Sequence, residues 1–537
     1  MVVYLKISGN ASEQATPENA TIIPATTGTN LARCLWLGGV FTGRVLCANL
    51  GRCGNCRVRY LDQAPTFSEK EKSILGEEAL AAGWRLACQH IVDPAAGLLL
   101  ELPSEKTDKK NLDALGSRYD IAIKKAALAV DLGTTSISWK SLALDASEKK
   151  DPSICSGSFV NPQAGCGADI VSRLEMATRS DGALHLSSLI IEDIKKIITS
   201  HFSGGWSIER ICVAANTAMT DIFLQQEICG LTRAPFRLAH HGNSFFKLSG
   251  LPPIYIPPFG APFIGGDISA GTLALIEAGV RRPFILADMG TNGEFVLLDN
   301  NDRLFMTSVP LGPALEGAGM DCGQLAGSGI FSSFSISPNG IRGKMAENFS
   351  PDVPSAGNYG ISATGYISLL ALLHRIGVLD DEGHFVHSKM PIAKMLERDI
   401  VTDANGARLT ITENLWLSTA DIEEMLKIKS AFSLALQSLL TAAGIEIADI
   451  ESICLGGALG QYASAMDLVE LGFIPAMLEK RLSCRGNTSL AGAASLVLNP
   501  KKGDKLARLF KNATLVCVQQ RNDFMETYLE HMKFCKW

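Results

Sequence analysis

The stretch AALAVDLGTTSISWKSLAL, residues 126–144, reads as an apolar strand, a turn of small residues and a second strand. The same design returns at 284–298 as FILADMGTNGEFVLL. Aligning Asp131 with Asp288 gives Asp-x-Gly-Thr in both copies. One copy would be weak evidence, because Asn-Gly between two apolar strands is most often a plain hairpin turn. Two copies indicate an internal duplication.

The chemistry of this loop gives a reason for both halves to keep it. Glycine lets the backbone approach a phosphate, and threonine hydroxyls beside main-chain N–H groups form a nest for an anion. Asp131 and Asp288, at the ends of the first strands, can hold Mg²⁺ through water, since this cation favours a few carboxylates and retained waters. We therefore predict that facing loops hold a triphosphate. The other predicted nucleotide-binding residues of these loops are Gly133, Thr134, Thr135, Gly290, Thr291, Asn292 and Gly293.

A third glycine element, ESICLGGALGQY at 451–462, follows an amphipathic helix and a short strand. In isolation, Gly-Gly after a strand is most often only a tight turn. After two phosphate hairpins, however, it resembles the adenosine motif of the actin, Hsp70 and sugar-kinase superfamily. This resemblance covers about 127–500 and implies an α/β ATPase fold with duplicated RNase H-like halves. It also implies that Gly456 and Gly457 lie along the adenosine.

The composition is that of an ordinary globular protein of several domains, with 537 residues, 47% hydrophobic residues and a formal net charge of −6. It gives no sign of nucleic-acid binding. The longest apolar runs fall far short of the ~20 residues of a membrane helix, and the first residues lack a secretory pattern. We therefore expect a cytoplasmic protein with neither nucleic acid nor membrane as a partner. A reducing cytosol argues against a disulfide framework for the 14 cysteines.

Four cysteines near the start have a spacing of their own. The stretch VLCANLGRCGNCRVRY, 45–60, contains Cys47, Cys53 and Cys56, and Cys88 follows in WRLACQHI. Zinc sites more usually show two Cys-x-x-Cys pairs, or one pair with histidines. The first gap is one residue longer than in plant-type ferredoxins. Three thiolates on one loop can wrap a small iron–sulfur cluster while a distant cysteine closes its far side.

The surroundings agree with a ferredoxin. Gly51 and Gly54 permit positive φ and can bring N–H groups close to the sulfurs. The pattern predicts strands at 2–8, 20–25, 56–62 and 97–103 and a helix within 28–39, which is β-grasp order. With the phrases CGNCRV and RLACQ, the long first gap resembles vertebrate and bacterial [2Fe–2S] ferredoxins. We take Cys47, Cys53, Cys56 and Cys88 as the cluster ligands, with structural zinc as the alternative.

The predicted fold class is therefore multidomain, with an α+β β-grasp ferredoxin domain followed by an α/β ATPase of the actin, Hsp70 and sugar-kinase type. A polar, lysine-rich segment separates the two. The predicted divisions are a [2Fe–2S] domain at 1–102, a linker at 103–125, a smaller first ATPase subdomain at 126–205, and a larger ATPase domain at 206–537 with the second phosphate loop and the adenosine motif.

A ferredoxin joined to such an ATPase is similar to the reductive activators of corrinoid-dependent methyltransferase systems, in the subgroup with an N-terminal [2Fe–2S] domain. The resemblance implies ATP-dependent delivery of one low-potential electron to a corrinoid protein whose cobalt has lapsed from Co(I) to Co(II). It also implies an external low-potential reductase or ferredoxin as electron donor, and it leaves open whether a homodimer forms. Further strings that carry it are FVNPQAGCGADIVSRL (159–174), VAANTAMTDIFL (213–224), PPFGAPFIGGDISAGTLA (257–274), LGPALEGAGMDCG (311–323) and GNTSLAGAASLVL (486–498).

The residue that activates water is less defined. The catalytic candidates are Asp288, Glu294 and Asp267, carboxylates beside the predicted phosphate region. For Glu294 and Asp267, an exposed strand carboxylate or a helix N-cap is an equally good interpretation. Two departures from the family pattern also occur. The loop has Ala48 and Asn49 where glycines often follow the first cysteine, and Asp221 stands where histidine is common, so any role of position 221 stays open.

Three other functions stay open at this point. The activators of 2-hydroxyacyl-CoA dehydratases are also electron-delivering ATPases of this superfamily, but they hold one [4Fe–4S] cluster between two subunits. A nucleotide-switched binding protein of Hsp70 or actin type with a zinc-stabilised N-terminal domain is a second alternative, and a small-molecule kinase is a third. The EPR spectrum of the reduced protein, metal analysis and a phosphate-transfer assay distinguish them.

Overall fold

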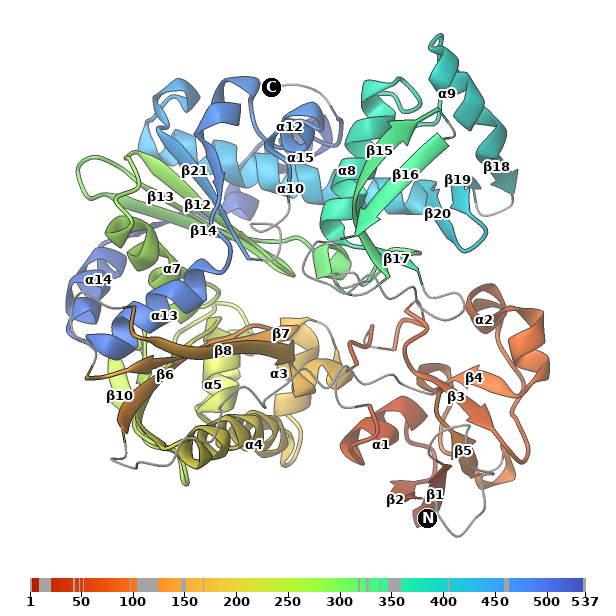
Figure 1. Ribbon diagram of the computed structural model, residues 1–537, viewed down its shortest axis with the longest axis horizontal. Helices are drawn as coiled ribbons and strands as arrows, with labels where there is room; N and C mark the ends of the chain where they lie inside the picture. Colours follow the sequence, from red (N-terminus) through yellow and green to blue (C-terminus); the bar gives the residue numbers. More distant parts are fainter. Residues whose placement is uncertain are drawn as a thin grey trace. The chain divides into compact units, whose positions relative to one another are not determined.

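The computed structural model (Figure 1) divides into two compact units. Nearly all of the predicted linker lies outside the described residues. Among the residues that are described, no helix is both long and apolar enough to cross a membrane. The described residues are 2–8, 21–41, 44–47, 49–51, 53–96, 98–103, 124–145, 151–167, 169–316, 319–324, 327, 329–338, 340–345, 359–403, 406–457 and 463–534. Unit 1 comprises Met1–Ile123, Thr134–Ser136 and Phe159–Trp206, and unit 2 comprises Lys124–Gly133, Ile137–Ser158 and Ser207–Trp537.

Unit 1 begins with a five-stranded sheet in the order β2-β1-β5-β3-β4. Strand β1 pairs with β2 in antiparallel fashion and with β5 in parallel, which confirms the predicted β-grasp order. The sequence prediction missed α2, whose helical pattern is interrupted by a glycine with φ of 75°, and the three-residue strand β4. The elements are β1 Val2–Ser8, β2 Thr21–Thr26, α1 Leu31–Leu37, β3 Arg57–Tyr60, α2 Glu69–Ala81, β4 Trp84–Leu86 and β5 Leu99–Glu101.

Helix α2 is fastened to the rest of this sheet by a buried carboxylate. Glu71 forms a capping box with Ser68 and also accepts hydrogen bonds from the Leu86 amide (2.9 Å) and the His90 ring (2.7 Å). Burial alone raises the pKa of Glu71, but the hydrogen bonds from His90, Ser68 and Leu86 outweigh it and bring the pKa to about 2. The anion therefore holds α2 against the end of β4, directly before the turn that carries Cys88.

The rest of unit 1 comes from the segment after strand β8, Ser153–Val160. A buried turn, η4 Pro162–Cys166, leads into α3 Ile170–Ala177 and the longer α4 Gly182–Ser203. The apolar residues of α4 recur with helical spacing and are buried, which explains why this segment folds as an amphipathic helix.

Unit 2 contains two six-stranded sheets with the same local topology. One has the order β10-β11-β9-β6-β7-β8 and the other β22-β21-β12-β13-β14-β23. In each, an antiparallel hairpin (β6–β7 or β12–β13) carries the repeated loop and a later strand, β9 or β21, lies beside its first strand. This agreement confirms the internal duplication. The strands are β6 Lys124–Leu132, β7 Ser136–Ala143, β8 Ser153–Val160, β9 Trp206–Ala214, β10 Ser244–Phe246, β11 Ile254–Ile256, β12 Phe284–Met289, β13 Asn292–Leu298, β14 Leu304–Pro310, β21 Ser452–Gly456, β22 Leu482–Cys484 and β23 Thr514–Leu515.

Two helices lie between these sheets in Figure 1, α7 Gly266–Glu277 and α13 Thr488–Leu498. They cross so closely that a side chain at Gly492 would meet the carbonyl oxygen of Ala270 at 1.8 Å. One hydrophobic core combines apolar residues of both helices with residues of both sheets. The N-termini of α7 and α13 are thereby fixed beside the strand ends that carry the repeated loops.

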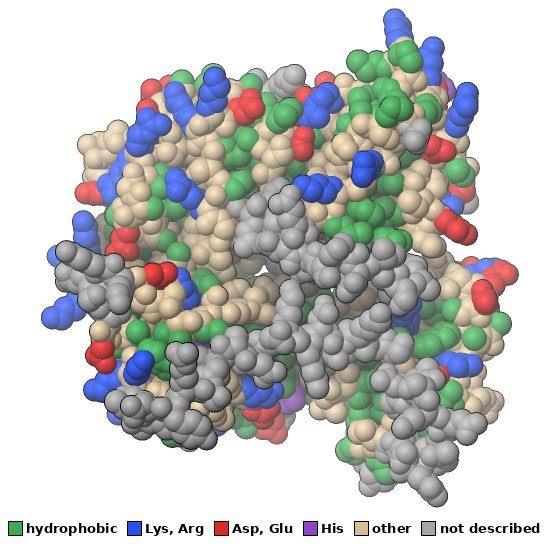
Figure 2. Space-filling view, in the orientation of Figure 1, with side chains coloured by type: hydrophobic (Ala, Val, Ile, Leu, Met, Phe, Trp, Pro, Cys, Tyr) green, Lys and Arg blue, Asp and Glu red, His purple; other side chains and the backbone are tan. Residues whose placement is uncertain are grey.

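The opposite face of β12 and β13 is covered by α8 Ala363–Arg375 and α10 Thr419–Ala443, which share a second core with it. Helix α10 starts with a capping box of Ser418 and Asp421 and ends at Gly444 in the left-handed conformation. On the face drawn in Figure 2, acidic and basic side chains are interspersed. The remaining elements of unit 2 are α5 Thr217–Phe223, α6 Cys229–Thr232, β15 Ile330–Ser337, β16 Gly340–Met345, β17 Gly360–Ile361, α9 Pro391–Leu396, β18 Ile400–Asp403, β19 Gly406–Thr412, β20 Leu415–Ser418, α12 Ala465–Glu470, α14 Lys502–Lys511 and α15 Phe524–Glu530.

Candidate functional site

The four predicted cluster cysteines converge in unit 1. Their sulfurs associate in two pairs, because the thiol of Cys53 is hydrogen-bonded to Cys47 and the thiol of Cys56 to Cys88. Hydrogen bonding to its partner and burial both raise the pKa of Cys53, and the same two causes raise that of Cys56. Cys47, Cys56 and Cys88 are buried and Cys53 is partly exposed. Two pairs of crowded sulfurs match a centre with two metal atoms, each taking two thiolates.

The glycines of the cluster loop adopt the predicted conformation. Gly51 and Gly54 have φ of 70° and 66°, and a side chain at Gly51 would meet the Gln89 amide nitrogen at 2.7 Å. The Gly51 N–H donates to the Cys88 sulfur, which also accepts a hydrogen bond from the Gln89 side chain (3.3 Å). Asn49 has φ of 66°, so it adopts a conformation that glycine favours. This conformation explains how Asn49 can stand where the family pattern has glycine. The other substituted position, Ala48, lies outside the described residues.

Donors aimed at the sulfurs are what an iron–sulfur cluster needs, because N–H···S hydrogen bonds offset the negative charge added on reduction. The residues present therefore fit such a cluster. In the part of the chain that the structure describes, no three His, Cys, Asp or Glu side chains are arranged as ligands of one metal ion. The cysteines form two pairs of sulfurs rather than one such group.

In unit 2, Asp288 occupies the centre of a second site. It lies near the end of β12, opposite Glu294 on β13 and opposite Gly456 on β21. A side chain at Gly457, whose φ is 69°, would meet an Asp288 carboxylate oxygen at 2.6 Å. The Gly-Gly sequence therefore leaves room for the Asp288 carboxylate, a role that the sequence did not predict. The predicted contact of Gly456 and Gly457 with adenosine stays a prediction.

Asp131, the equivalent residue of the first hairpin, lies at the N-terminus of α13. Its carboxylate accepts hydrogen bonds from the Asn487 amide (2.6 Å) and the Ser489 hydroxyl (2.8 Å). Burial raises the pKa of Asp131, and the two hydrogen bonds oppose the rise. The adjacent Thr488 hydroxyl is buried without a hydrogen-bond partner among the described residues. A buried hydroxyl of this kind is normally satisfied by water or a ligand.

Asp267, in the first turn of α7, completes a group of three carboxylates. Burial first, and then the negative charges of Asp288 and Asp131, raise the pKa of Asp267 to about 7. All three aspartates nevertheless keep part of their surface accessible, so a ligand can reach them. Three like charges in a poorly solvated site are costly, and a bound cation would relieve that cost.

Glu294 is buried and accepts a hydrogen bond from the Asn216 side chain at 3.4 Å. Asn216 is also the N-cap of α5, so this carboxylate is tied to a helix end. In the same loop, the Thr291 carbonyl accepts hydrogen bonds from Leu311 (3.1 Å) and Gly312 (3.0 Å). These bonds fix the backbone of the second predicted phosphate loop.

The glycines of the second loop differ in role. Gly290 donates its N–H to the Asn292 carbonyl (3.0 Å) and forms the turn. A side chain at Gly293 would meet Leu311 at 2.8 Å and Phe295 at 2.9 Å. Packing therefore requires glycine at 293, where we expected close approach to a phosphate.

The first predicted phosphate loop is divided between the units, whereas the second belongs entirely to unit 2. Asp131 and Gly133 belong to unit 2, whereas Thr134 and Thr135 belong to unit 1. In unit 1 the Thr134 carbonyl accepts from the buried Arg173, and the Thr135 carbonyl accepts from the Asn161 amide (2.8 Å).

Sequence reasoning missed the residues that hold the carboxylates in place. Asn487 and Ser489 lie in the string GNTSLAGAASLVL, and Asn216 lies in the string VAANTAMTDIFL. Both strings resemble the family, but neither indicated a contact with a carboxylate. Asp221, the second departure from the family pattern, forms a buried pair with His240 (2.9 Å). The second carboxylate oxygen of Asp221 is buried without a hydrogen-bond partner among the described residues.

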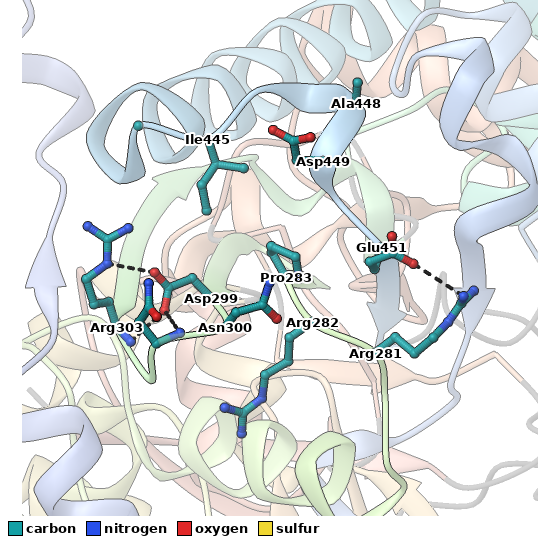
Figure 3. A pocket seen from close by; sticks show the side chains of 12 residues that line it. Arg281, Arg282, Pro283, Asp299, Asn300, Arg303, Ile445, Ala448, Asp449 and Glu451 are labelled. Atoms are coloured by element: carbon teal, nitrogen blue, oxygen red, sulfur yellow. Dashed lines mark hydrogen bonds and ion pairs between the residues drawn. The ribbon is translucent and has the colours of Figure 1, made fainter.

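A pocket of about 660 Å³ lies elsewhere in unit 2 (Figure 3). It is lined by Pro283, before β12, and Asp299, after β13, so it lies at the end of the hairpin away from Asp288. Its arginines are engaged, since Arg281 pairs with Glu451 (3.3 Å) and Arg303 with Asp299 (2.6 Å). This pocket is therefore not part of the carboxylate site.

Fold and sites together define a multidomain protein with an iron–sulfur type β-grasp domain and an ATPase of the actin, Hsp70 and sugar-kinase class. Comparison with known families agrees with this for three successive regions. Residues 28–93 match the 2Fe-2S iron-sulfur cluster binding domain, residues 126–276 the RACo middle region, and residues 282–536 the C-terminal domain of RACo, the ASKHA domain. The chain thus carries the domains of the RACo family in order, which confirms the resemblance that its sequence predicted.

Relatives and solved structures extend this result. The chain is 25% identical over 398 residues to the corrinoid activation enzyme RamQ of Eubacterium limosum, covering 70% of this chain but only 65% of RamQ, less than two thirds of its length. It is 26% identical over 433 residues to the [Co(II) methylated amine-specific corrinoid protein] reductase of Methanosarcina barkeri, covering 72% of each. A solved reductive activator for a corrinoid, iron-sulfur protein has a TM-score of 0.65 and 21% identity over 98% of both chains, which shows the shared fold.

Proposed function

We propose that this protein reduces the cobalt of a corrinoid protein from Co(II) to Co(I) at the expense of ATP, in the cytoplasm. The observation that carries the proposal is the presence, in one chain, of four converging cysteines and a separate group of three aspartates on a duplicated ATPase fold. The electron donor would be an external low-potential reductase or ferredoxin.

Cys47, Cys53, Cys56 and Cys88 would hold a [2Fe–2S] cluster, which when bound supplies one electron at low potential. The pairing of the sulfurs supports Cys47 and Cys53 on one iron and Cys56 and Cys88 on the other. The Gly51 amide and the Gln89 side chain would stabilise the reduced state by donating to Cys88. Cys53, the most accessible of the four, marks the side on which an electron would enter or leave.

The aspartates of unit 2 would hold MgATP. Asp131 and Asp288 would bind Mg²⁺ through water, and the backbone of the repeated loops would bind the phosphates. The raised pKa of Asp267 supports a need for a cation in this site. Asp267 and Glu294 remain the two candidates for positioning the attacking water, with Glu294 already oriented by Asn216.

Coupling between the cluster and the nucleotide site would supply free energy for an uphill electron transfer. If the donor lies about 100 mV above the acceptor, a one-electron transfer is uphill by roughly 2.3 kcal/mol. Nucleotide binding or hydrolysis can offset this if it favours a conformation in which the reduced acceptor is released.

A direct assay tests the proposal. The anaerobically prepared protein is mixed with a reductant, MgATP and a Co(II) corrinoid protein, and the absorbance of Co(I) is followed. We expect Co(I) to accumulate only with ATP and an intact cluster. Protein that stays colourless and free of iron after careful reconstitution would refute the proposal.

The same preparation separates the rival functions. An EPR spectrum of a [4Fe–4S] cluster in the reduced protein would favour a dehydratase-type activator. Zinc without iron would favour a nucleotide-switched binding protein, and phosphate transfer to a sugar or carboxylic acid would favour a kinase. Sedimentation of the purified protein decides whether a homodimer forms.

A further inference from the structure

Within unit 1, helix α1 of the ferredoxin domain is anchored to the turn η4 by one aromatic side chain. Trp36 is 2% exposed, and its indole N–H donates to the Pro162 carbonyl oxygen at 3.1 Å. Its ring also makes an edge contact with His185 of α4, at 5.2 Å between centroids. Trp36 is thus buried against a segment that lies more than 120 residues later in the chain.

The turn accepts Trp36 because it has no side chain at one position. A Cβ atom at Gly165 would lie 1.9 Å from the indole Cδ1 and 2.3 Å from Nε1. No real contact is that short, so even a methyl group at Gly165 would displace the indole. The adjacent Asn161, Gln163 and Ala164 are fully buried, which leaves the turn little freedom to move away.

The same turn touches the cluster loop directly. The Leu46 N–H donates to the Ala164 carbonyl oxygen at 3.2 Å, and Leu46 directly precedes the predicted ligand Cys47. Movement of the turn would therefore pull on the backbone that positions one of the two sulfurs of the first pair.

At its other end the turn touches the first phosphate loop. The Asn161 N–H donates to the Thr135 carbonyl at 2.8 Å. Arg173, which is completely buried, donates to the Thr134 carbonyl and also to the Gln163 side chain at 3.0 Å. Both threonine carbonyls of the predicted nucleotide loop are thus held by the segment that anchors Trp36.

We propose that the turn at 161–166 couples the first nucleotide loop to the cluster loop, with Trp36, Gly165 and Arg173 as positioning residues. This inference rests on the proposed function, because it takes Thr134 and Thr135 as nucleotide-binding. A bound nucleotide would order this loop with the loop's N–H groups toward the phosphates. The carbonyls of Thr134 and Thr135 would then stay directed at Arg173 and Asn161. Bound nucleotide therefore stabilises the turn, the Trp36 contact and the Leu46 hydrogen bond.

Contiguous contacts do not by themselves establish coupling, so the test measures it. Hydrogen exchange of the Leu46 amide is followed by mass spectrometry in the full cluster-loaded chain, with and without a non-hydrolysable MgATP analogue. In the wild type we expect the analogue to slow exchange about 5-fold or more, the lower end of typical allosteric couplings. In Gly165→Ala we expect faster exchange without nucleotide and no further effect of the analogue.

Two further variants keep the test specific. In a Trp36→Ala background the added methyl of Gly165→Ala has no indole to displace, so the double variant should behave as Trp36→Ala alone. Phe202→Ala removes an aromatic that is 65% exposed on α4 and should behave as the wild type. Because coupling is reciprocal, Gly165→Ala should bind the analogue more weakly by no more than the factor measured at Leu46.

The possible outcomes distinguish a failure of the proposed nucleotide site from a failure of the proposed coupling. If calorimetry shows that the analogue does not bind the wild type, the proposed nucleotide site fails and the coupling falls with it. If the analogue binds but leaves Leu46 exchange unchanged, or acts equally in wild type and Gly165→Ala, the coupling is refuted and the proposed function stands.

Discussion

The cysteine site and the carboxylate site are assembled in different ways. The four cysteines come from one loop and one turn of a single small domain, between residues 47 and 88. The three aspartates come from β6, α7 and β12, and the partners that orient the site lie on α5 and α13. The first site is fixed by local backbone geometry, and the second by the packing of distant elements.

The two sites also differ in how their charge is balanced. Around the sulfurs, the Gly51 amide and the Gln89 side chain already donate hydrogen bonds. Around Asp267, burial first and then the charges of Asp288 and Asp131 raise its pKa to about 7. The cysteine site is therefore prepared for a cofactor that stays, whereas the repulsion in the carboxylate site would be relieved only by the proposed Mg²⁺ and its nucleotide.

The largest effect is expected from Cys53→Ala. Loss of one of four thiolates leaves one metal atom without its second cysteine, so we expect loss of iron, of visible absorbance and of all Co(I) formation. ATP binding should survive, because the carboxylate site uses none of these residues. The matched control is Cys229→Ala, which removes an exposed cysteine outside the site and should keep the iron content of the wild type.

The second prediction alters the carboxylate site and leaves the cysteine site intact. Asp288→Asn removes the charge that we propose for Mg²⁺ binding, and we expect ATP-dependent Co(I) formation to fall by about 100-fold, which corresponds to ~2.7 kcal/mol. The iron content and the EPR spectrum of the reduced cluster should not change. A variant that keeps normal ATP-dependent activity would remove Asp288 from the site, and loss of iron would show that the two sites are not independent.

This difference explains what the sequence could predict. The cysteine ligands, the two hairpin aspartates and the order of strands follow from local motifs, and the fold confirms the duplication and the β-grasp order. Asn487, Ser489 and Asn216 could not be found in this way, because only the crossing of α7 and α13 and the position of α5 bring them to the carboxylates. Helix α2 was missed because Gly76 interrupts its period.

A smaller effect is expected at the glycine turn after β21. In Gly457→Ala, the new methyl would lie 2.6 Å from an Asp288 oxygen at a φ of 69°, so we expect about tenfold weaker nucleotide binding, measured by calorimetry. Gly444→Ala is the matched control, since its φ is 66° but nothing lies within 4 Å of the added group. That variant should lose about 1 kcal/mol of stability and no nucleotide affinity. Equal binding by both variants would show that the contact between residue 457 and Asp288 does not affect nucleotide binding.

The smallest effect concerns two copies of one local motif. Glu71 and Asp421 occupy the same capping-box position, in α2 and α10. Glu71 gains a hydrogen bond from His90, which helps to bring its pKa to about 2 despite burial. Asp421 is buried near the negative Asp321, and burial first and that charge second raise its pKa to about 7. The same capping-box motif thus gives a lowered pKa in one helix and a raised pKa in the other, because the groups that surround the two carboxylates differ.

The direction in which each carboxyl changes the stability of the fold with pH follows from the difference between its folded and unfolded pKa values. Glu71 has a lowered pKa, so its stabilisation is present above its unfolded value and does not change between pH 5.5 and 8. Asp421 has a raised pKa, so its contribution is lost as pH rises through about 7. Unfolding by urea at pH 5.5 and 8 should therefore show that Asp421→Asn removes about 1–2 kcal/mol of pH dependence, and that Glu71→Gln removes none. An unchanged pH dependence in Asp421→Asn would mean that Asp421 is ionised in the folded protein at both values, and that its surroundings are not those described.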